Sequence, residues 1–120
     1  MLRVKAWFSL LLMLSTAAPA FSISEPGKID LLLDRVEKSN LVFIRNGIKY
    51  SSTRAREHLE HKLKMAGDRI QTARQFIEHV ASRSYLTGIP YYVQYKNGKK
   101  VKTGSWLKNQ LLQIEKNENR

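Results

Sequence analysis

Four stretches of the chain carry apolar residues at the spacing of one helical face. Their apolar positions are Ile29, Leu32, Leu33 and Val36; Ala55, Leu59, Leu63 and Ala66; Ala73, Phe76, Ile77, Val80 and Ala81; and Leu107, Leu111 and Ile114. A residue that can cap a helix precedes each stretch, namely Ser24, a hydroxyl of residues 51–53, Thr72 and Ser105. The pattern therefore predicts four amphipathic helices.

Between these stretches lie two short pairs of strand-like segments. Residues 41–44 and 48–50 flank Asn46-Gly47, and residues 91–95 and 99–103 flank Asn97-Gly98. Asn-Gly favours a two-residue hairpin turn because both central positions of that turn need a positive φ. The order helix, hairpin, helix thus occurs twice, with the two turn glycines 51 residues apart. An isolated hairpin is marginal in water. We therefore expect an α+β fold of two α-β-β-α pseudo-repeats, whose hairpins form one small antiparallel sheet against four helices.

The N-terminus predicts export. Arg3 and Lys5 precede an apolar stretch, residues 6–14, and Ala18-Pro19-Ala20 allows cleavage after Ala20, with Ser22 as a second option. The alternative is an uncleaved anchor, but the strongly apolar part is shorter than the ~20 residues that cross a bilayer. The expected organisation is a signal peptide at 1–20, a linker at 21–27, one α+β domain at 28–116 and a tail at 117–120.

Composition adds a strong positive charge to this picture. The whole chain has 21 Lys and Arg against 10 Asp and Glu, and no cysteine. The leader holds two basic residues and no acid, so the mature protein would carry 19 basic and 10 acidic residues, a net charge of +9. This charge predicts attraction to polyanions, although a solvated basic surface explains it equally well. Without cysteine, neither disulfides nor a lipoprotein anchor are available.

The basic residues concentrate around the second hairpin. Between Glu78 and Glu115 there is no acid, and Tyr85, Tyr91, Tyr92, Tyr95 and Trp106 alternate with basic residues. Basic side chains among aromatic ones suit phosphate-bearing or stacked ligands. The alternative is that the aromatics belong to the core and the lysines protect sheet edges. The residues of this candidate patch are Arg83, Lys96, Lys99, Lys100, Lys102 and Lys108.

Catalytic patterns are missing from the sequence. His58, His61 and His79 occur without the H-E-x-x-H spacing of a zinc site, and no Gly-x-Ser-x-Gly nucleophile turn occurs. We therefore predict no catalytic residue, no metal and no cofactor.

Three stretches carry a family resemblance: SSTRAREHLEHKL, TARQFIEHVASRSYLTGIPYYV and SWLKNQL. On these stretches the chain resembles the YfeK-like family, small exported bacterial proteins of unknown function. The resemblance implies a periplasmic location, and it supplies no activity or catalytic residue. The basic second hairpin lies outside the pattern. The matching residues are Phe43, Asn46-Gly47, Tyr50, Ala55, His58-Leu59, Lys62, Thr72-Ala73, Phe76-Ile77, Ala81-Ser82, Ser84, Thr87-Gly88, Pro90-Tyr91 and Trp106-Leu107.

Polar members of this pattern suggest a second candidate site, where the third helix meets the second hairpin. Their alternative role is purely structural, as caps, turn residues and the rim of the core. The residues of this candidate pocket are Tyr50, His58, Ser82, Ser84, Thr87, Tyr91 and Trp106.

Together these features predict a periplasmic, non-enzymatic binding module for an anionic envelope component or a partner protein. The alternatives are an inhibitor of a wall-degrading enzyme, similar to lysozyme inhibitors, and a small hydrolase. Export argues against nucleic acid as the natural partner, and membrane contact is expected only through an uncleaved signal peptide. The sequence does not predict an oligomeric state.

Overall fold

The computed structural model describes residues 22–119 of the chain. The expected signal peptide, residues 1–20, lies outside the described residues. Within residues 22–119 no helix is both long and apolar enough to cross a membrane. The elements are α2 (Glu25–Lys38), β1 (Val42–Arg45), β2 (Ile48–Tyr50), α3 (Ser52–Ala66), a 3₁₀ turn η1 (Gly67–Arg69), α4 (Ala73–His79), β3 (Tyr92–Gln94), β4 (Lys100–Lys102) and α5 (Thr103–Glu118).

Local chemistry explains where the first three helices begin. The Ser24 hydroxyl accepts from the amide of Gly27, and the Ser51 hydroxyl accepts from the amide of Arg54. Thr72 forms a reciprocal capping box with Gln75 at the start of α4. Such caps satisfy amides that a helix leaves free at its N-terminus. The predicted caps of these three helices are therefore present.

The four strands form one antiparallel sheet in the order β2-β1-β3-β4. The central pair joins the two hairpins, with Phe43 opposite Val93. The first strands of the two hairpins form the antiparallel central pair, and the second strand of each hairpin lies at an edge. Two repeats related by a two-fold axis would give this strand order. The helices and the small sheet confirm the predicted α+β fold.

The two Asn-Gly turns differ in conformation. Asn46 and Gly47 have φ values of 49° and 78°, as a type I′ turn requires. In the second hairpin only Gly98 has a positive φ, and its amide donates to the Tyr95 carbonyl. The second connection is therefore a four-residue turn that ends at Gly98, which leaves Lys99 outside β4.

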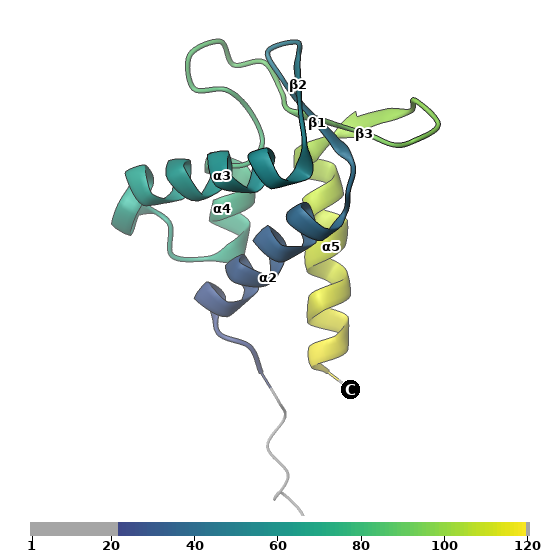
Figure 1. Ribbon diagram of the computed structural model, residues 1–120. Coiled ribbons are helices and arrows are strands. Elements are labelled where there is room, and N and C mark those ends of the chain that lie inside the picture. Colours follow the sequence, from purple (N-terminus) through teal and green to yellow (C-terminus); the bar gives the residue numbers. More distant parts are fainter. Residues whose placement is uncertain (1–21, 120) are drawn as a thin grey trace, which may run out of the picture.

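The helices cover one face of the sheet, and the hydrophobic core lies between them. Phe43 and Val93 are buried on this inner face, and the Phe43 ring meets the Trp106 ring of α5 edge to face at 5.9 Å. In Figure 1 both hairpins stand at one end of the molecule, and α5 runs from them towards the other end. We call these the hairpin end and the helical end.

Two features differ from the expected boundaries. The fourth helix begins at Thr103 with no side-chain cap, so the prediction that Ser105 caps it is wrong. The Thr103 amide instead donates to the Tyr91 carbonyl, which lets β4 continue directly into α5. Helix α2 begins at Glu25, within the segment expected as a linker, and α5 extends to Glu118, within the expected tail.

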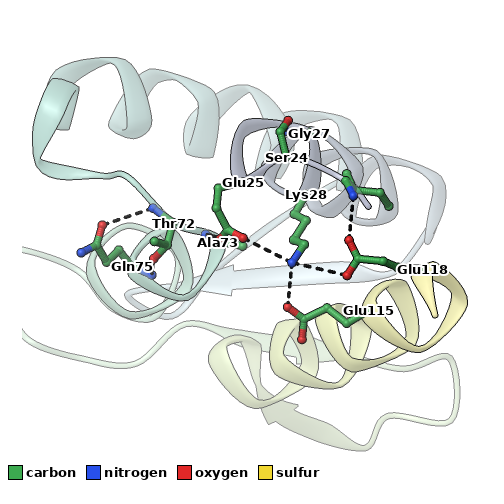
Figure 2. A network of polar contacts seen from close by, with 10 residues as sticks. Ser24, Glu25, Gly27, Lys28, Thr72, Ala73, Gln75, Glu115 and Glu118 are labelled. Carbon is green, nitrogen blue, oxygen red and sulfur yellow. Dashed lines mark hydrogen bonds and ion pairs between the residues drawn. The ribbon is translucent and has the colours of Figure 1, made fainter. Parts of the chain in front are cut away.

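A buried lysine connects three helices at the helical end. The Lys28 ammonium lies 3.2 Å from a Glu25 oxygen, 3.1 Å from Glu115 and 3.7 Å from Glu118 (Figure 2). Glu25 also accepts from the Ala73 amide at the start of α4. This backbone hydrogen bond lowers the pKa of Glu25, and the Glu115 hydrogen bond raises the pKa of Lys28. The cluster therefore holds the ends of α2, α4 and α5 together.

Candidate functional site

A cleft of about 240 Å³ opens between the first hairpin and the N-terminal half of α3. Apolar side chains of Phe43, Ala55 and Leu59 contribute to its walls, and Tyr91 closes it from the second repeat. Polar groups of Arg45, Tyr50, His58 and Thr103 also line it. The cleft thus combines an apolar surface with a few converging polar atoms, which is the usual make-up of a small-ligand site.

Arg45 is the central charge of the cleft. It ends β1 on the same sheet face as Phe43, because side chains alternate along a strand. One guanidinium nitrogen lies 2.8 Å from His58 Nε2 and 3.1 Å from Nδ1, and the other donates to the Tyr50 hydroxyl at 3.1 Å. Within the described part of the chain, Arg45 makes no ion pair with a carboxylate.

His58 is held neutral in this setting. Burial, followed by the charges of Arg45, Lys62 and His61, lowers the pKa of His58 to about 4. A guanidinium only donates hydrogen bonds, so the ring nitrogen that faces Arg45 must be unprotonated and accept. At neutral pH the imidazole therefore orients Arg45 and adds no positive charge of its own.

A second cation, Lys62, lies behind the cleft wall. It is only 7% exposed although it carries a charge, and its ammonium donates to the Tyr91 hydroxyl at 2.8 Å and to the Arg83 carbonyl at 3.1 Å. The ammonium also lies over the rings of Tyr85 and Tyr91, at 4.2 and 4.7 Å from their centres. Burial, and then the Arg45 charge, lowers the pKa of Lys62 to about 8. Burial also raises the pKa of Tyr91.

Thr103 lies at the cleft and has a buried hydroxyl without a hydrogen-bond partner among residues 22–119. The residue is 1% exposed, and its Oγ1 is the buried side-chain oxygen for which residues 22–119 provide no partner. Buried polar groups in proteins are almost always hydrogen-bonded. The Thr103 hydroxyl, which is buried beside the cleft, is an exception to this rule.

The structure brings together part of the pocket predicted from the sequence. Tyr50, His58 and Tyr91 line the cleft. Ser84 and Thr87 are not among the residues that line the cleft, and they lie in a loop whose Thr87 hydroxyl donates to Asn46 Oδ1 at 2.8 Å. Two predicted members have structural roles elsewhere. The Ser82 hydroxyl donates to the Ile77 carbonyl at the end of α4, and Trp106 packs in the core against Phe43.

Sequence reasoning missed Arg45, Lys62 and Thr103. A pattern was available for Lys62, which lies one helical turn after His58, and for Arg45, which shares a hairpin with Tyr50. Nothing local identified Thr103, because its burial depends on the junction between β4 and α5.

The predicted basic patch does not form one site. Lys100 and Lys102 are exposed on the outer face of the sheet. Strand pairing on this face gives one row across the sheet, in the order Lys49, Ile44, Tyr92 and Lys102. The remaining members are dispersed: Lys96 and Lys99 around the second turn, Lys108 on α5 beside Glu78 and Glu115, and Arg83 in the loop after α4.

Residues 22–119 contain no group of three or more His, Asp or Glu side chains placed to hold a metal ion. His61 and His79 are exposed on their helices.

The fold and cleft define a small α+β protein whose apolar recess is lined by Arg45 and Arg54, with the buried Lys62 behind its wall. Residues 24–115 match a family of unknown function, DUF5329, and the chain belongs to this family. Over 68 residues it is 43% identical to a protein of Salmonella typhimurium strain LT2 named Uncharacterized protein YfeK. That alignment covers 56% of this chain and 57% of the relative, so the chain spans just over half of the relative's length. The predicted YfeK-like resemblance is confirmed. No solved structure matches the chain.

Proposed function

We propose that this protein is an exported binding module whose cleft receives the anionic group of an envelope component or partner segment. The observation that carries the proposal is the environment of Arg45. Its guanidinium faces the cleft beside a neutral imidazole and a tyrosine hydroxyl, and within residues 22–119 it forms no ion pair with a carboxylate. An unneutralised arginine in a recess favours a planar anion, because its two-pronged donor set matches carboxylate and phosphate oxygens.

Lys62 supports the same ligand chemistry. Burial next to another cation is unfavourable for its ammonium, as its lowered pKa shows. An anion bound near Arg45 would offset part of this repulsion. The apolar walls formed by Phe43, Ala55 and Leu59 would receive the carbon skeleton that bears the anionic group. The expected ligand is therefore amphipathic, with one carboxylate or phosphate attached to a compact apolar body.

The cleft is favoured over the basic second hairpin as the binding site. The lysines of that hairpin are exposed and distributed around a turn and an outer sheet face. Exposed charges contribute little to affinity because water and salt screen them. Export rests on the predicted leader, and it would place the ligand in the periplasm.

The test is a titration of the protein, residues 21–120, followed by amide chemical shifts. Benzoate, phenyl phosphate and benzyl alcohol serve as probes, because they share a ring and differ in the group attached to it. We expect benzoate or phenyl phosphate to shift the amides around Arg45 and Thr103, and the comparison of the two distinguishes carboxylate from phosphate. Benzyl alcohol should bind at least tenfold more weakly.

Arg45→Met keeps an unbranched apolar stem and removes the charge. We expect it to weaken binding of the preferred anion at least tenfold, which corresponds to ~1.4 kcal/mol. Lys99→Met removes an exposed turn lysine and is the matched control, which should bind as the wild type does. Equal binding of benzyl alcohol and the anions, or normal anion binding by Arg45→Met, would contradict the proposal.

A further inference from the structure

Exposed apolar side chains gather at the hairpin end. Leu86 is 96% exposed and Ile48 is 57% exposed, and Tyr85 and Ile89 are exposed beside Leu86 in the same loop. We call Ile48, Tyr85, Leu86 and Ile89 the apolar tip. Single exposed apolar residues are ordinary on protein surfaces, whereas a group of them at one place marks an interaction surface.

The loop of the apolar tip is ordered by its own hydrogen bonds. The Ser84 amide donates to the Ile89 carbonyl at 3.1 Å, and the Gly88 amide donates to the Ser84 carbonyl at 3.0 Å. Thr87 connects the loop to Asn46 at the end of the first hairpin. Figure 1 shows this loop and the first hairpin rising next to each other. The apolar side chains are thus presented together by two connected segments.

Acidic residues are absent from the segments that form the hairpin end. Residues 38–56 and 79–114, which include both hairpins and the loop of the apolar tip, contain eleven Lys and Arg and no acid. All ten Asp and Glu lie in residues 25–37, 57–78 and 115–118. Lys49 and Arg83 are the exposed cations nearest in sequence to the tip residues.

We propose that the apolar tip docks on an anionic lipid bilayer. Aliphatic and aromatic side chains surrounded by cations suit a membrane interface, where the apolar groups enter the headgroup boundary and the cations attract anionic lipids. The tip projects from two loops and has no acidic neighbour in either segment, so charge complementarity selects an anionic surface. This contact is separate from the predicted signal peptide, and it does not depend on the cleft or its ligand.

The test is co-sedimentation of residues 21–120 with lipid vesicles. This segment contains the entire core described above, so it is expected to fold without the leader. We expect binding to vesicles of phosphatidylcholine and phosphatidylglycerol in a 3:1 ratio, and at least tenfold weaker binding to pure phosphatidylcholine. Leu86→Ser/Ile89→Ser should lower the partition coefficient on the mixed vesicles at least tenfold. Leu112→Ser is the matched control, because Leu112 is 59% exposed but lies on α5.

A second variant gives a direct readout of insertion. Leu86→Trp should show a blue shift of its added fluorescence when the mixed vesicles are supplied, whereas Leu112→Trp should not. Leu86→Ser/Ile89→Ser should bind the preferred anion of the cleft as the wild type does, so failure of the cleft proposal and failure of this one are distinguishable. Circular dichroism melts confirm that each variant is folded.

Four results would overturn the docking proposal. The first is no binding to mixed vesicles, and the second is binding that salt removes but Leu86→Ser/Ile89→Ser leaves unchanged. The third is that the protein does not bind vesicles but self-associates in analytical ultracentrifugation, and that the double variant does not self-associate. This result would mean that the apolar tip contacts a second copy of the chain. The fourth is that the protein does not bind vesicles but inhibits lysozyme, and that the double variant does not inhibit it. This result would mean that the apolar tip contacts a protein partner.

Discussion

Arg45 sets the electrostatics of the cleft through its neighbours. Its charge contributes to the lowered pKa of both His58 and Lys62, after burial in each case. Among the described residues that line the cleft, the one acid, Glu57, is exposed and lies 3.9 Å from Arg54. The residues that touch Arg45 are therefore polar and uncharged at neutral pH, which leaves its positive charge available.

The lowered pKa of His58 predicts how stability depends on pH. Between the ordinary histidine pKa of ~6.5 and the folded value of about 4, the unfolded chain takes up a proton that the folded protein does not. Stability should therefore fall as the pH drops through this window. For a half-buried ring we expect this loss to be about 1–2 kcal/mol.

His58→Gln removes this titration and keeps a hydrogen-bonding side chain. Urea unfolding at several pH values between 7 and 4 should show a smaller loss of stability in the variant than in the wild type. His79→Gln, at an exposed histidine, is the control and should follow the wild type. Parallel curves for His58→Gln and the wild type would mean that His58 titrates normally.

At the scale of elements, a close approach between the segment after α4 and the first turn of α5 depends on a glycine. A Cβ at position 104 would lie 2.6 Å from the Ser82 Oγ, and this hydroxyl is held by its hydrogen bond to the Ile77 carbonyl. Gly104→Ala would ordinarily favour a helix by about 1 kcal/mol. Here we expect it to destabilise the protein by about 1–2 kcal/mol, because the first turn of α5 must shift.

Ser82→Ala removes the oxygen that the new methyl group would meet. Chemical unfolding of both single variants and of Gly104→Ala/Ser82→Ala forms a double-mutant cycle. We expect the double variant to recover at least ~1 kcal/mol relative to additivity. If the two effects simply add, the contact does not constrain the junction.

The elements themselves were predictable to different degrees. The stripe Ile29, Leu32, Leu33 and Val36 and the capping residues Ser24 and Thr72 identify helices by local rules, and the structure contains them. The start of α5 was not predictable from Ser105, because a tertiary hydrogen bond between Thr103 and Tyr91 sets it. The cleft was only partly predictable for the same reason. Lys62 acquires its special environment from packing against Arg83 and Tyr91, which are distant from it in the sequence.

At the scale of the whole molecule, the acids are absent from both hairpins and from the loop of the apolar tip. The hairpin end carries the cleft, the apolar tip and the exposed lysines of the second hairpin, whereas several acids of the helical end make internal contacts. Glu118 accepts from the Ile23 amide, and Glu25 accepts from the Ala73 amide. The acids thus stabilise the scaffold, which leaves the positive charge of the other end for interactions.

Lys28 is the cation that neutralises the acids at the helical end, where three carboxylates surround it (Figure 2). Lys28→Met keeps most of the apolar stem but leaves Glu25, Glu115 and Glu118 to repel one another. We expect a loss of about 2 kcal/mol in the free energy of unfolding at pH 7. Protonation of the carboxylates removes this repulsion, so the loss should shrink as the pH falls below ~4 and the acids become neutral. Lys64→Met, at an exposed lysine of α3, provides the comparison and should change stability by less than ~0.5 kcal/mol. A loss in Lys28→Met that is the same at pH 7 and pH 3 would show that packing of the stem, and not charge, is what Lys28 contributes.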